Sequence, residues 1–353
     1  MDRREYYRSH EKLSFIGSAG QQLLQQAKVL VVGAGGLGCP CLKWLAGSGI
    51  GVIGIVDFDT VSVSNLHRQV LYDVKDTGQS KALVAAEKLS AYNPYITLRP
   101  HRAMVDEGNV LTLLADYDII VDCTDNFQVR YLINDACVVL NKPLVYGAIH
   151  QWEGHVTVFN YQGSGTLRCL FPETDQNDGI QSCADIGAYN IITGIIGLMM
   201  ANEVIKIILQ REEVLAGRLY HFDALSGNSR RINYQPVEGN REKSSARFEQ
   251  ALPPVEISPE LLQQKMLNSE PFRLVDVREA DERRLFNIGG EHIPLRQFLQ
   301  QSPPDIDPAD TIIIYCERGG RSLQTAKYLR TRGFVHAYSL QGGMQLWQQM
   351  EVK

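Results

Sequence analysis

The chain has 353 residues, with 35 Lys and Arg against 40 Asp and Glu, giving a formal net charge of −5. Hydrophobic residues make up 44% and charged residues 21%, which is typical of a soluble globular protein and excludes a largely disordered, collagen-like or membrane-embedded chain. The mildly acidic balance argues against nonspecific nucleic-acid binding, because such binding requires concentrated positive charge. At roughly 150 residues per domain, this length predicts about two domains.

Short apolar runs alternate with longer amphipathic segments from the start of the chain. Strands are predicted at 28–32, 52–56, 117–122 and 143–146, and helices at 39–46, 80–92 and 126–140. This alternation is typical of an α/β fold, in which a Rossmann-like, mostly parallel sheet carries helices on both faces. Two later strands, 155–159 and 218–222, are expected to be antiparallel.

The longest apolar stretch and the cysteines bear on the compartment. Residues 191–209 include Asn202, Glu203 and Lys206, so we expect a buried helix and no membrane span. The first eight residues are charged and no apolar core follows them, which predicts no secretory signal. The seven cysteines are irregularly spaced, which favours reduced thiols in the cytoplasm.

The stretch 235–254 differs from its surroundings. It is polar, lacks a sustained apolar period and ends in two prolines, so it is predicted to be an interdomain linker. A second alternation follows, with strands expected at 272–277 and 311–315 and a helix at 322–332. The predicted organisation is a first domain at 1–234, a linker at 235–254 and a smaller α/β domain at 255–353.

A glycine-rich turn follows the first predicted strand and comprises Gly33, Gly35, Gly36 and Gly38. Glycines let the backbone approach phosphates, and the N-terminus of the next helix offers unpaired N–H groups. Asp57 lies 19 residues after Gly38, at the end of the next strand, where a carboxylate can accept hydrogen bonds from ribose hydroxyls. The pattern predicts a nucleotide site; the alternative is a tight turn without a ligand.

Charged residues beyond the turn favour a triphosphate. Arg68 and Lys81 are expected to neutralise the phosphates, although each alone would also suit a solvated surface. Asp125 follows a parallel strand, whose carboxyl end faces the ligand crevice, and is placed to hold Mg²⁺. The alternative is that one of the acids here, Asp122 or Asp125, caps the following helix.

Together these motifs resemble the ThiF/MoeB/HesA family, the bacterial relatives of ubiquitin-activating enzymes, over roughly Tyr6 to Tyr234. The resemblance implies ATP-dependent adenylylation of the C-terminal Gly-Gly carboxylate of a small ubiquitin-like sulfur carrier protein of the MoaD or ThiS type. That carboxylate is already ionised, so the site needs to align it and stabilise the departing pyrophosphate. By motif position, nucleotide and magnesium roles fall on Gly33, Gly35, Gly36, Gly38, Asp57, Ser64, Asn65, Arg68, Lys81, Asp125 and Asn126, with Asp125 as the magnesium ligand.

The chain departs from the family in several places. Arg8 lies where the family has an arginine finger that reaches the partner's active site in a homodimer, but the flanking motif is altered. Family members often bind zinc through two C-x-x-C pairs; here Thr166 precedes Cys169 and the second pair is missing, so no structural zinc is expected. Cys183 matches a family cysteine that in some relatives binds the carrier covalently, and an inert loop thiol is the equal alternative.

A second reactive site is predicted at Cys316, which follows an apolar strand and opens a helix. The helix N-terminus and the nearby Arg318 and Arg321 favour the thiolate. The block resembles rhodanese domains, which carry sulfur as a cysteine persulfide; Asp276 and Arg278 are expected to brace the domain. A phosphatase of related fold would need Arg at position 322, which is Ser.

The two halves suit one reaction sequence, because a persulfide can attack the activated carrier to give a thiocarboxylate. The fusion resembles MoeB–rhodanese proteins of molybdopterin or thiamine synthesis. We expect ATP and Mg²⁺, a Gly-Gly carrier, thiosulfate or a cysteine desulfurase as sulfur donor, a homodimer, and no nucleic-acid or membrane partner. The alternatives are a conjugating enzyme with a thioester at Cys183, a NAD-dependent oxidoreductase, and a non-catalytic scaffold.

Overall fold

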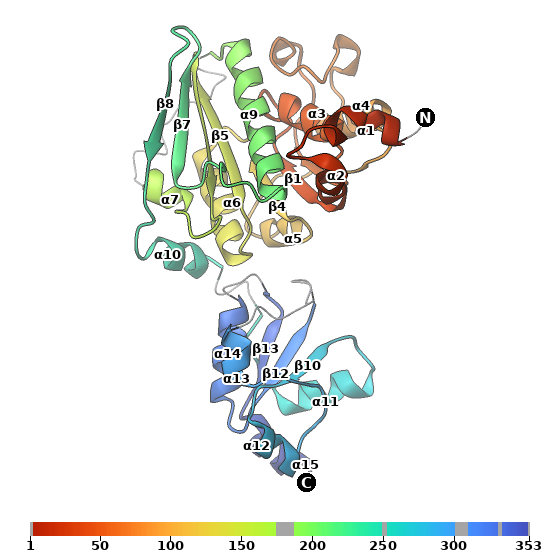
Figure 1. The fold of residues 1–353 in the computed structure, drawn as a ribbon, viewed down its shortest axis with the longest axis vertical. Helices are drawn as coiled ribbons and strands as arrows, with labels where there is room; N and C mark the ends of the chain where they lie inside the picture. Colours follow the sequence, from red (N-terminus) through yellow and green to blue (C-terminus); the bar gives the residue numbers. More distant parts are fainter. Residues whose placement is uncertain (1–2, 174–186, 249–252, 301–309, 331–333, 352–353) are drawn as a thin grey trace. The chain divides into compact units, whose positions relative to one another are not determined.

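The computed structural model describes residues 3–173, 187–248, 253–300, 310–330 and 334–351 (Figure 1). The chain divides into two compact units, the first comprising Met1–Val138 and Lys142–Ser244 and the second Val139–Asn141 and Ser245–Lys353. The change from one unit to the other after Ser244 falls inside the stretch predicted as a linker.

The first unit is built on an eight-stranded sheet with the order β3-β2-β1-β4-β5-β6-β7-β8. The first five strands in this order are parallel, and β6, β7 and β8 are antiparallel to their neighbours. The predicted α/β class, with a large and mostly parallel sheet, is confirmed. The strand bounds are β1 (Lys28–Val32), β2 (Val52–Val56), β3 (Thr97–His101), β4 (Ile119–Asp122), β5 (Leu144–His150), β6 (Glu153–Phe159), β7 (Arg218–Asp223) and β8 (Ser229–Asn233).

The strand order reverses direction at β1, which places the functional crevice. The chain runs outward from β1 to β2 and β3, then returns to β4 on the other side of β1. Right-handed crossovers in opposite directions put their helices on opposite faces of the sheet. The loops after β1 and β4 therefore separate at the carboxyl edge and leave a crevice there.

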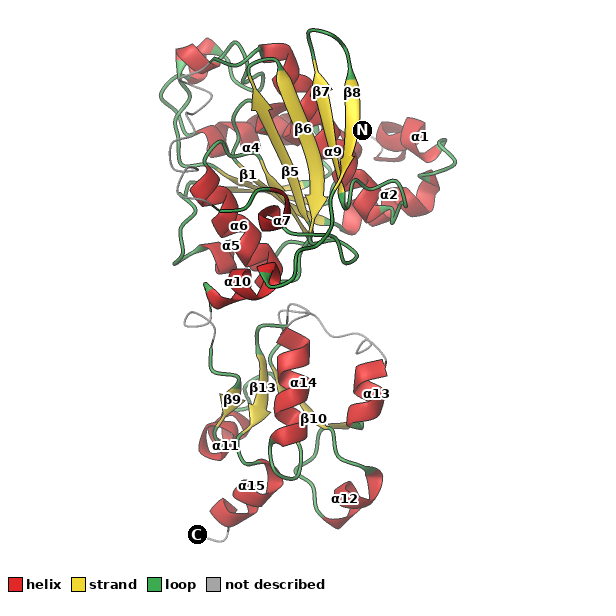
Figure 2. Cartoon of the chain, turned by 90° about the vertical axis from the view of Figure 1, so that its left-hand side faces the viewer, coloured by secondary structure: helices red, strands yellow, loops and turns green. Residues whose placement is uncertain are grey.

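Helices complete the first unit (Figure 2). Helix α9 packs on β5, β6 and α3 and buries Ile192, Ile196, Met200 and Val204. Among the described helices, α9 alone is long and apolar enough to cross a membrane by length and composition; its buried face shows it to be a core helix, as predicted. The helix bounds are α1 (Arg3–Glu11), α2 (Gly17–Gln26), α3 (Gly38–Ser48), α4 (Lys81–Tyr92), α5 (Val110–Ala115), α6 (Phe127–Val139), α7 (Leu167–Leu170), α9 (Asn190–Ile208) and α10 (Asn240–Ala246), with short 3-10 turns η1 (Val63–Asn65) and η2 (Val74–Asp76).

Helix α10 lies inside the stretch predicted as a linker, which is a correction to that prediction. Arg241 donates hydrogen bonds to the Asn160 Oδ1 at 2.6 Å and to the Ser164 carbonyl at 3.2 Å. The Asn134 amide contacts the Ser244 hydroxyl at 3.4 Å. Because α10 is held to the first unit largely by polar contacts, it lacks the apolar period by which a helix is recognised in a sequence.

The second unit holds a five-stranded, fully parallel sheet with the order β11-β10-β12-β13-β9. On one face Ile312 and Ile314 of β12 pack with Ala326 and Leu329 of α14, and on the other Ile313 packs among side chains from α11 and α15. Both faces of this small sheet are therefore covered. The bounds are β9 (Glu256–Ile257), β10 (Arg273–Asp276), β11 (Glu291–His292), β12 (Ile312–Tyr315), β13 (Ala337–Leu340), α11 (Pro259–Leu267), α12 (Ala280–Leu285), α13 (Leu295–Gln300), α14 (Gly320–Arg330) and α15 (Gly343–Glu351).

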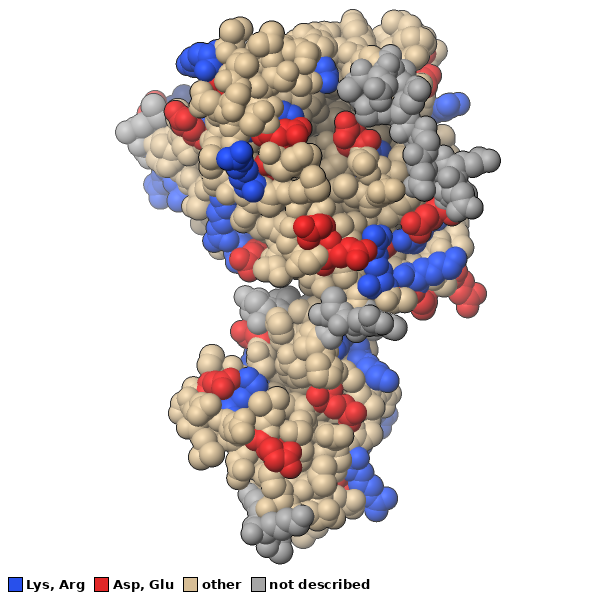
Figure 3. All heavy atoms as spheres, turned by 180° about the vertical axis from the view of Figure 1, so that it is seen from behind, with Lys and Arg blue, Asp and Glu red and all other residues tan. Residues whose placement is uncertain are grey.

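Charges are mixed on the surface drawn in Figure 3. On that face, Lys and Arg side chains alternate with Asp and Glu side chains. A stripe of positive charge that would follow a nucleic-acid backbone is not visible on it.

Candidate functional site

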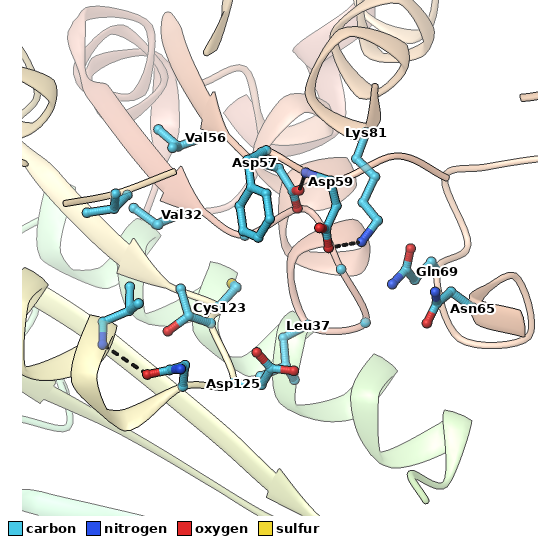
Figure 4. A pocket seen from close by; sticks show the side chains of 18 of the residues that line it. Val32, Leu37, Val56, Asp57, Asp59, Asn65, Gln69, Lys81, Cys123 and Asp125 are labelled. Carbon is cyan, nitrogen blue, oxygen red and sulfur yellow. Dashed lines mark hydrogen bonds and ion pairs between the residues drawn. The ribbon is translucent and has the colours of Figure 1, made fainter. Parts of the chain in front are cut away.

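A cavity of about 510 Å³ opens where β1, β2 and β4 end. Its volume lies in the range of pockets that hold small ligands, roughly 300–1,000 Å³. Figure 4 shows Asp57, Asp59 and Lys81 on one side of this space and Asp125 on another. The structure thus gathers side chains that are far apart in the sequence. The predicted residues that line the cavity are Gly33, Gly35, Gly36, Asp57, Asn65, Arg68, Lys81, Asp125 and Asn126.

The glycine turn has strict steric requirements. Gly33 has a φ of 93°, which favours glycine, and a Cβ there would lie 2.9 Å from the Cys123 carbonyl oxygen. A Cβ on Gly38 would lie 1.9 Å from the Gly33 carbonyl oxygen. Gly38 does not line the cavity, so it acts by letting α3 start against the turn.

Asp57 ties the turn to the end of β2. One carboxylate oxygen accepts the Ala34 N–H and the other accepts the Asp59 N–H, each at 2.8 Å. Burial raises the pKa of Asp57, although the nearby Lys81 and the two N–H donors oppose that shift. Because a carboxylate oxygen can accept more than one hydrogen bond, Asp57 retains the capacity to accept from a ribose hydroxyl.

The two predicted phosphate cations are each held by a neighbour. The Lys81 ammonium lies 2.8 Å from the Asp59 Oδ2 and its side chain is almost fully buried. The Arg68 guanidinium donates to the Asn65 Oδ1 at 2.6 Å. Both cations line the cavity, so neither is the solvated surface charge that was the alternative.

Gln69 is a site residue that the sequence reasoning did not single out. Only 4% of it is exposed, it lines the cavity, and its Oε1 has no hydrogen-bond partner in the described part of the chain. A buried amide oxygen without a partner is costly unless a ligand supplies one. The signal available in the sequence was its place directly after Arg68.

The loop after β4 presents Asp125 to the cavity. Its side chain is exposed and makes no hydrogen bond or ion pair with another described residue. The Asn126 Oδ1 accepts the Gln128 N–H at 2.8 Å and the Val129 N–H at 3.2 Å, and so caps α6. The alternative that Asp122 or Asp125 caps this helix is therefore wrong.

Asp122, the last residue of β4, holds the same loop by hydrogen bonds. It is fully buried and accepts the Thr124 N–H at 2.9 Å and the Thr124 hydroxyl at 2.7 Å through one oxygen. Burial raises the pKa of Asp122, against the influence of the nearby Arg130. Asp122 thus fixes the loop on which Asp125 stands.

Two predicted residues, Ser64 and Arg8, lie outside this cavity. The Ser64 side chain is exposed beside the Ser62 hydroxyl, 3.0 Å away, and does not line the cavity. Arg8 is exposed on α1 and does not line the cavity of its own chain. Cys183 lies outside the described residues.

In the second unit, Cys316 directly follows β12 and only 1% of it is exposed. Its sulfur accepts the Ser322 N–H at 3.3 Å and lies 3.4 Å from the Ser322 hydroxyl. A Cβ on Gly343 would lie 2.8 Å from the Arg318 nitrogen, so glycine there leaves room for the loop. The first turn of α14 thus holds the thiol, and the loop before it packs closely against Gly343.

Arg278 braces this unit, as predicted. Its guanidinium is 2% exposed and bonds both oxygens of the buried Asp276, at 3.0 and 2.9 Å. It also donates to the Phe286 carbonyl at 2.7 Å and to the Glu317 Oε2 at 3.2 Å. The brace therefore reaches the residue that follows Cys316.

Cys169 is the one cysteine at the position of the family's first C-x-x-C pair, where Thr166 replaces the other cysteine. Its sulfur accepts the Thr166 and Val237 N–H groups at 3.4 and 3.3 Å, and lies 3.5 Å from both the Thr166 Oγ1 and the Asn240 Nδ2. Burial raises the pKa of this thiol, but the donors from Asn240, Thr166 and Val237 outweigh it and lower the pKa overall. Among the described residues, no three His, Cys, Asp or Glu side chains form a metal-binding group.

Comparison with known proteins bears on both sites. The sequence matches the ThiF family over residues 6–243 and the Rhodanese-like domain over residues 258–350. The chain is 36% identical to the probable adenylyltransferase/sulfurtransferase MoeZ of Mycobacterium tuberculosis, over 97% of this chain and 92% of that protein. It is 44% identical to the sulfur carrier protein adenylyltransferase of Thermus thermophilus, over 62% of this chain and 82% of that protein.

A solved structure supports the fold. The crystal structure of E. coli MccB with ATP matches with a TM-score of 0.58 and 22% sequence identity, and covers 68% of this chain and 73% of that chain. At this identity the likeness concerns the fold alone.

Proposed function

Because the chain belongs to the ThiF family and carries a C-terminal rhodanese-like domain, we propose that it adenylylates the C-terminal Gly-Gly carboxylate of a ubiquitin-like sulfur carrier protein and converts it to a thiocarboxylate. It is an enzyme, a nucleotidyltransferase with sulfurtransferase activity, which sets aside the scaffold and oxidoreductase alternatives. The observation that carries the first step is the single cavity that gathers the glycine turn, Arg68, Lys81 and Asp125.

The residues of this cavity fit a bound ATP with its magnesium ion. The Gly33–Gly38 turn offers backbone N–H groups to phosphate, and the Gln69 Oε1, which has no partner among the described residues, can accept a hydrogen bond from a donor group of the nucleotide. The free carboxylate of Asp125 suits a hard cation that also takes phosphate oxygens. When bound, Mg²⁺ would neutralise charge on the phosphates.

The chain's own residues then align the reactants. The carrier carboxylate is the nucleophile and forms a bond to the α-phosphorus, while the bond to pyrophosphate breaks. Arg68 and Lys81 stabilise the charge that leaves with pyrophosphate. Asn65 and Asp59, which hold these two cations now, position them for that role.

Sulfur transfer follows at Cys316. The terminal sulfur of a Cys316 persulfide attacks the carbonyl carbon of the acyl-adenylate, and AMP leaves with the electron pair of the broken C–O bond. A second thiol then cleaves the S–S bond, which releases the thiocarboxylate and leaves Cys316 in a disulfide with that thiol. Cys183 would bind the carrier covalently or be inert in this reaction; in the alternative function it would be a thioester site for protein conjugation.

A homodimer with Arg8 acting in the partner's site accounts for the position of that residue. Arg8 is exposed and does not line its own cavity. Helices α2 and α3 expose the apolar side chains of Leu23 and Trp44, which a second copy would cover. Mixing two inactive variants, Arg8→Ala and Asp125→Ala, should restore carrier-dependent activity in hybrid dimers; no recovery in proven hybrids would refute the shared site.

The pathway and the compartment belong to the same proposal. We place the enzyme in the cytoplasm, where its thiols stay reduced, and in sulfur transfer to a molybdopterin or thiamine precursor. The probable molybdopterin-synthase adenylyltransferase of Porphyra purpurea, 36% identical over 97% of this chain and 92% of that protein, supports the first of these. No structural zinc is expected.

The test uses purified protein, ATP, Mg²⁺, a sulfur donor and candidate carriers that end in Gly-Gly. Cys316→Ala should retain carrier-dependent ATP–pyrophosphate exchange and lose thiocarboxylate, measured by the intact mass of the carrier. The proposed substrate is wrong if none of a series of carriers, including both MoaD-type and ThiS-type proteins, is adenylylated. Undiminished thiocarboxylate with Cys316→Ala would overturn the role of that thiol.

A further inference from the structure

The segment that follows Cys316 runs from Glu317 into the first turn of α14 and contains three charged side chains, Glu317, Arg318 and Arg321. Glu317 is held by the Arg278 guanidinium at 3.2 Å. Arg321 is held by Glu282 of α12, with its Nη1 2.7 Å from the Glu282 Oε2 and its Nη2 on the Oε1. Arg318 is exposed and has no hydrogen bond or ion pair within the described ranges. Arg318 is thus available to a ligand, whereas Arg321 is occupied by Glu282.

The pair between Glu282 and Arg321 is built to persist. The Glu282 Oε2 also accepts the Glu279 N–H at 2.9 Å at the start of α12. This hydrogen bond fixes the position of the carboxylate that Arg321 contacts. The contact is bidentate, the strongest geometry for a guanidinium and a carboxylate. About one third of each side chain is exposed, so solvent screens the pair only in part.

This pair changes what the thiol site can attract. Thiosulfate is a small dianion, and a dianion needs convergent cations to be drawn out of water. Of the two arginines that follow Cys316, Arg318 has no partner among the described residues, while the negative charge of Glu282 offsets that of Arg321. A cysteine persulfide carries at most one negative charge on its outer sulfur, fewer than the two of thiosulfate, and has less need of such a cluster.

We propose that Glu282 is a specificity-determining residue of sulfur loading, which holds Arg321 so that Cys316 accepts sulfur from a cysteine persulfide in preference to thiosulfate. This inference rests on the proposed role of Cys316 as the sulfur carrier. In the reaction, the Cys316 thiolate attacks the outer sulfur of the donor and forms an S–S bond. The donor's own S–S bond breaks and its inner sulfur leaves as a thiolate with the electron pair, so no oxidant or reductant is required.

The experiment compares two donors on the full chain, thiosulfate and L-cysteine persulfide, with cyanide as the acceptor and thiocyanate as the product. The readout is the ratio of kcat/KM for thiosulfate to that for the persulfide, which cancels general damage to the thiol. Glu282→Gln keeps an oxygen for the Glu279 N–H but releases Arg321. The ratio should rise about tenfold, the effect of one added charge-assisted hydrogen bond.

Two further variants test the route of the effect. Glu279→Gln removes a neighbouring carboxylate that does not bond Arg321, and should change the ratio less than about twofold. The double variant Glu282→Gln, Arg321→Gln restores the wild-type charge balance, and its ratio should return to the wild-type value. It also tests the inference if Glu282→Gln alone does not fold.

The inference is overturned if Glu282→Gln leaves the ratio unchanged, or if the double variant retains the gain. It is also overturned if the double variant loses thiosulfate turnover selectively, since Arg321 would then already serve the anion in the wild type. A failure of the proposed function looks different: after the enzyme-free reaction of each donor with cyanide is subtracted, Cys316→Ser would still release thiocyanate from both donors, whatever residue 282 is.

Discussion

Replacing Asp125 by alanine should separate catalysis from stability in the first unit. Its carboxylate is exposed and unpaired among the described residues, so its removal should change the free energy of unfolding by less than about 0.5 kcal/mol. In catalysis it is the carboxylate assigned to the metal, and losing one preorganised electrostatic contact lowers kcat by about 10²–10³-fold. Activity should therefore fall without a matching loss of stability.

Asp122 provides the matched control, because it is a carboxylate on the same strand end with the opposite expectation. It is fully buried and accepts two hydrogen bonds from Thr124. Asp122→Ala leaves both donors without that acceptor, which should cost roughly 2–3 kcal/mol of stability. Its effect on activity should follow from the disturbed loop.

The assay pairs carrier-dependent ATP–pyrophosphate exchange with urea unfolding for both variants. In Asp125→Ala the rate of exchange should fall strongly while the urea concentration at half-unfolding stays unchanged. In Asp122→Ala that urea concentration should fall. Exchange at the wild-type rate in Asp125→Ala would refute the metal role. If the urea midpoint of unfolding falls equally in both variants, Asp125 does contribute to stability and this expectation is wrong.

Three more predictions concern stability. Arg278→Met should cost roughly 1–3 kcal/mol in the second unit, because the buried Asp276 loses its two-point partner and keeps only Arg283, 3.6 Å from its Oδ2. Urea unfolding followed through Trp347 fluorescence, with Trp44 and Trp152 replaced by phenylalanine, checks this, and a neutral result would contradict the brace. Hydrogen bonding by Arg321 lowers the pKa of Glu282 to about 2, so the pair stabilises the fold fully above the ordinary value of 4.5 and loses that contribution as the pH falls toward about 2. The difference in unfolding midpoint between wild type and Glu282→Gln should accordingly shrink with acid, and a difference that grows would contradict the assignment. Cys169→Ala should cost roughly 1–3 kcal/mol by leaving the Val237 and Thr166 N–H groups without an acceptor, and should speed amide exchange in α10; unchanged exchange there would argue against the contact.

The sequence predicted the elements whose pattern is local and missed those held by distant partners. Strands β1 and β2 coincide with the predicted runs because both are buried and almost continuously apolar. Strand β8 is exposed along its whole length and β3 is partly exposed, so neither carries the apolar run that marks a buried strand. Helix α10 was missed for the same reason, since its contacts are polar.

The sequence predicted which residues form the site, but not how their side chains are paired or oriented. Motif order placed the glycine turn, Asp57, Arg68 and Lys81 together, and the structure brings them to one cavity. That Lys81 is already paired with Asp59 depends on how β2 and α4 meet, which spacing alone does not give. The division of labour between Asp125 and Asn126 likewise required the direction in which each side chain leaves the loop.

The surroundings of Cys169 bring two pairs of equally spaced residues together. Thr166 and Cys169 share the spacing of Val237 and Asn240, and the two segments converge on one sulfur atom. Substituting Thr166, Val237 and Asn240 by cysteine would set four thiols around a common centre, the ligand number and kind that a structural zinc ion requires. The joint between α7 and α10 is thus a place where hydrogen bonding and metal coordination are interchangeable solutions, separated by a short mutational path.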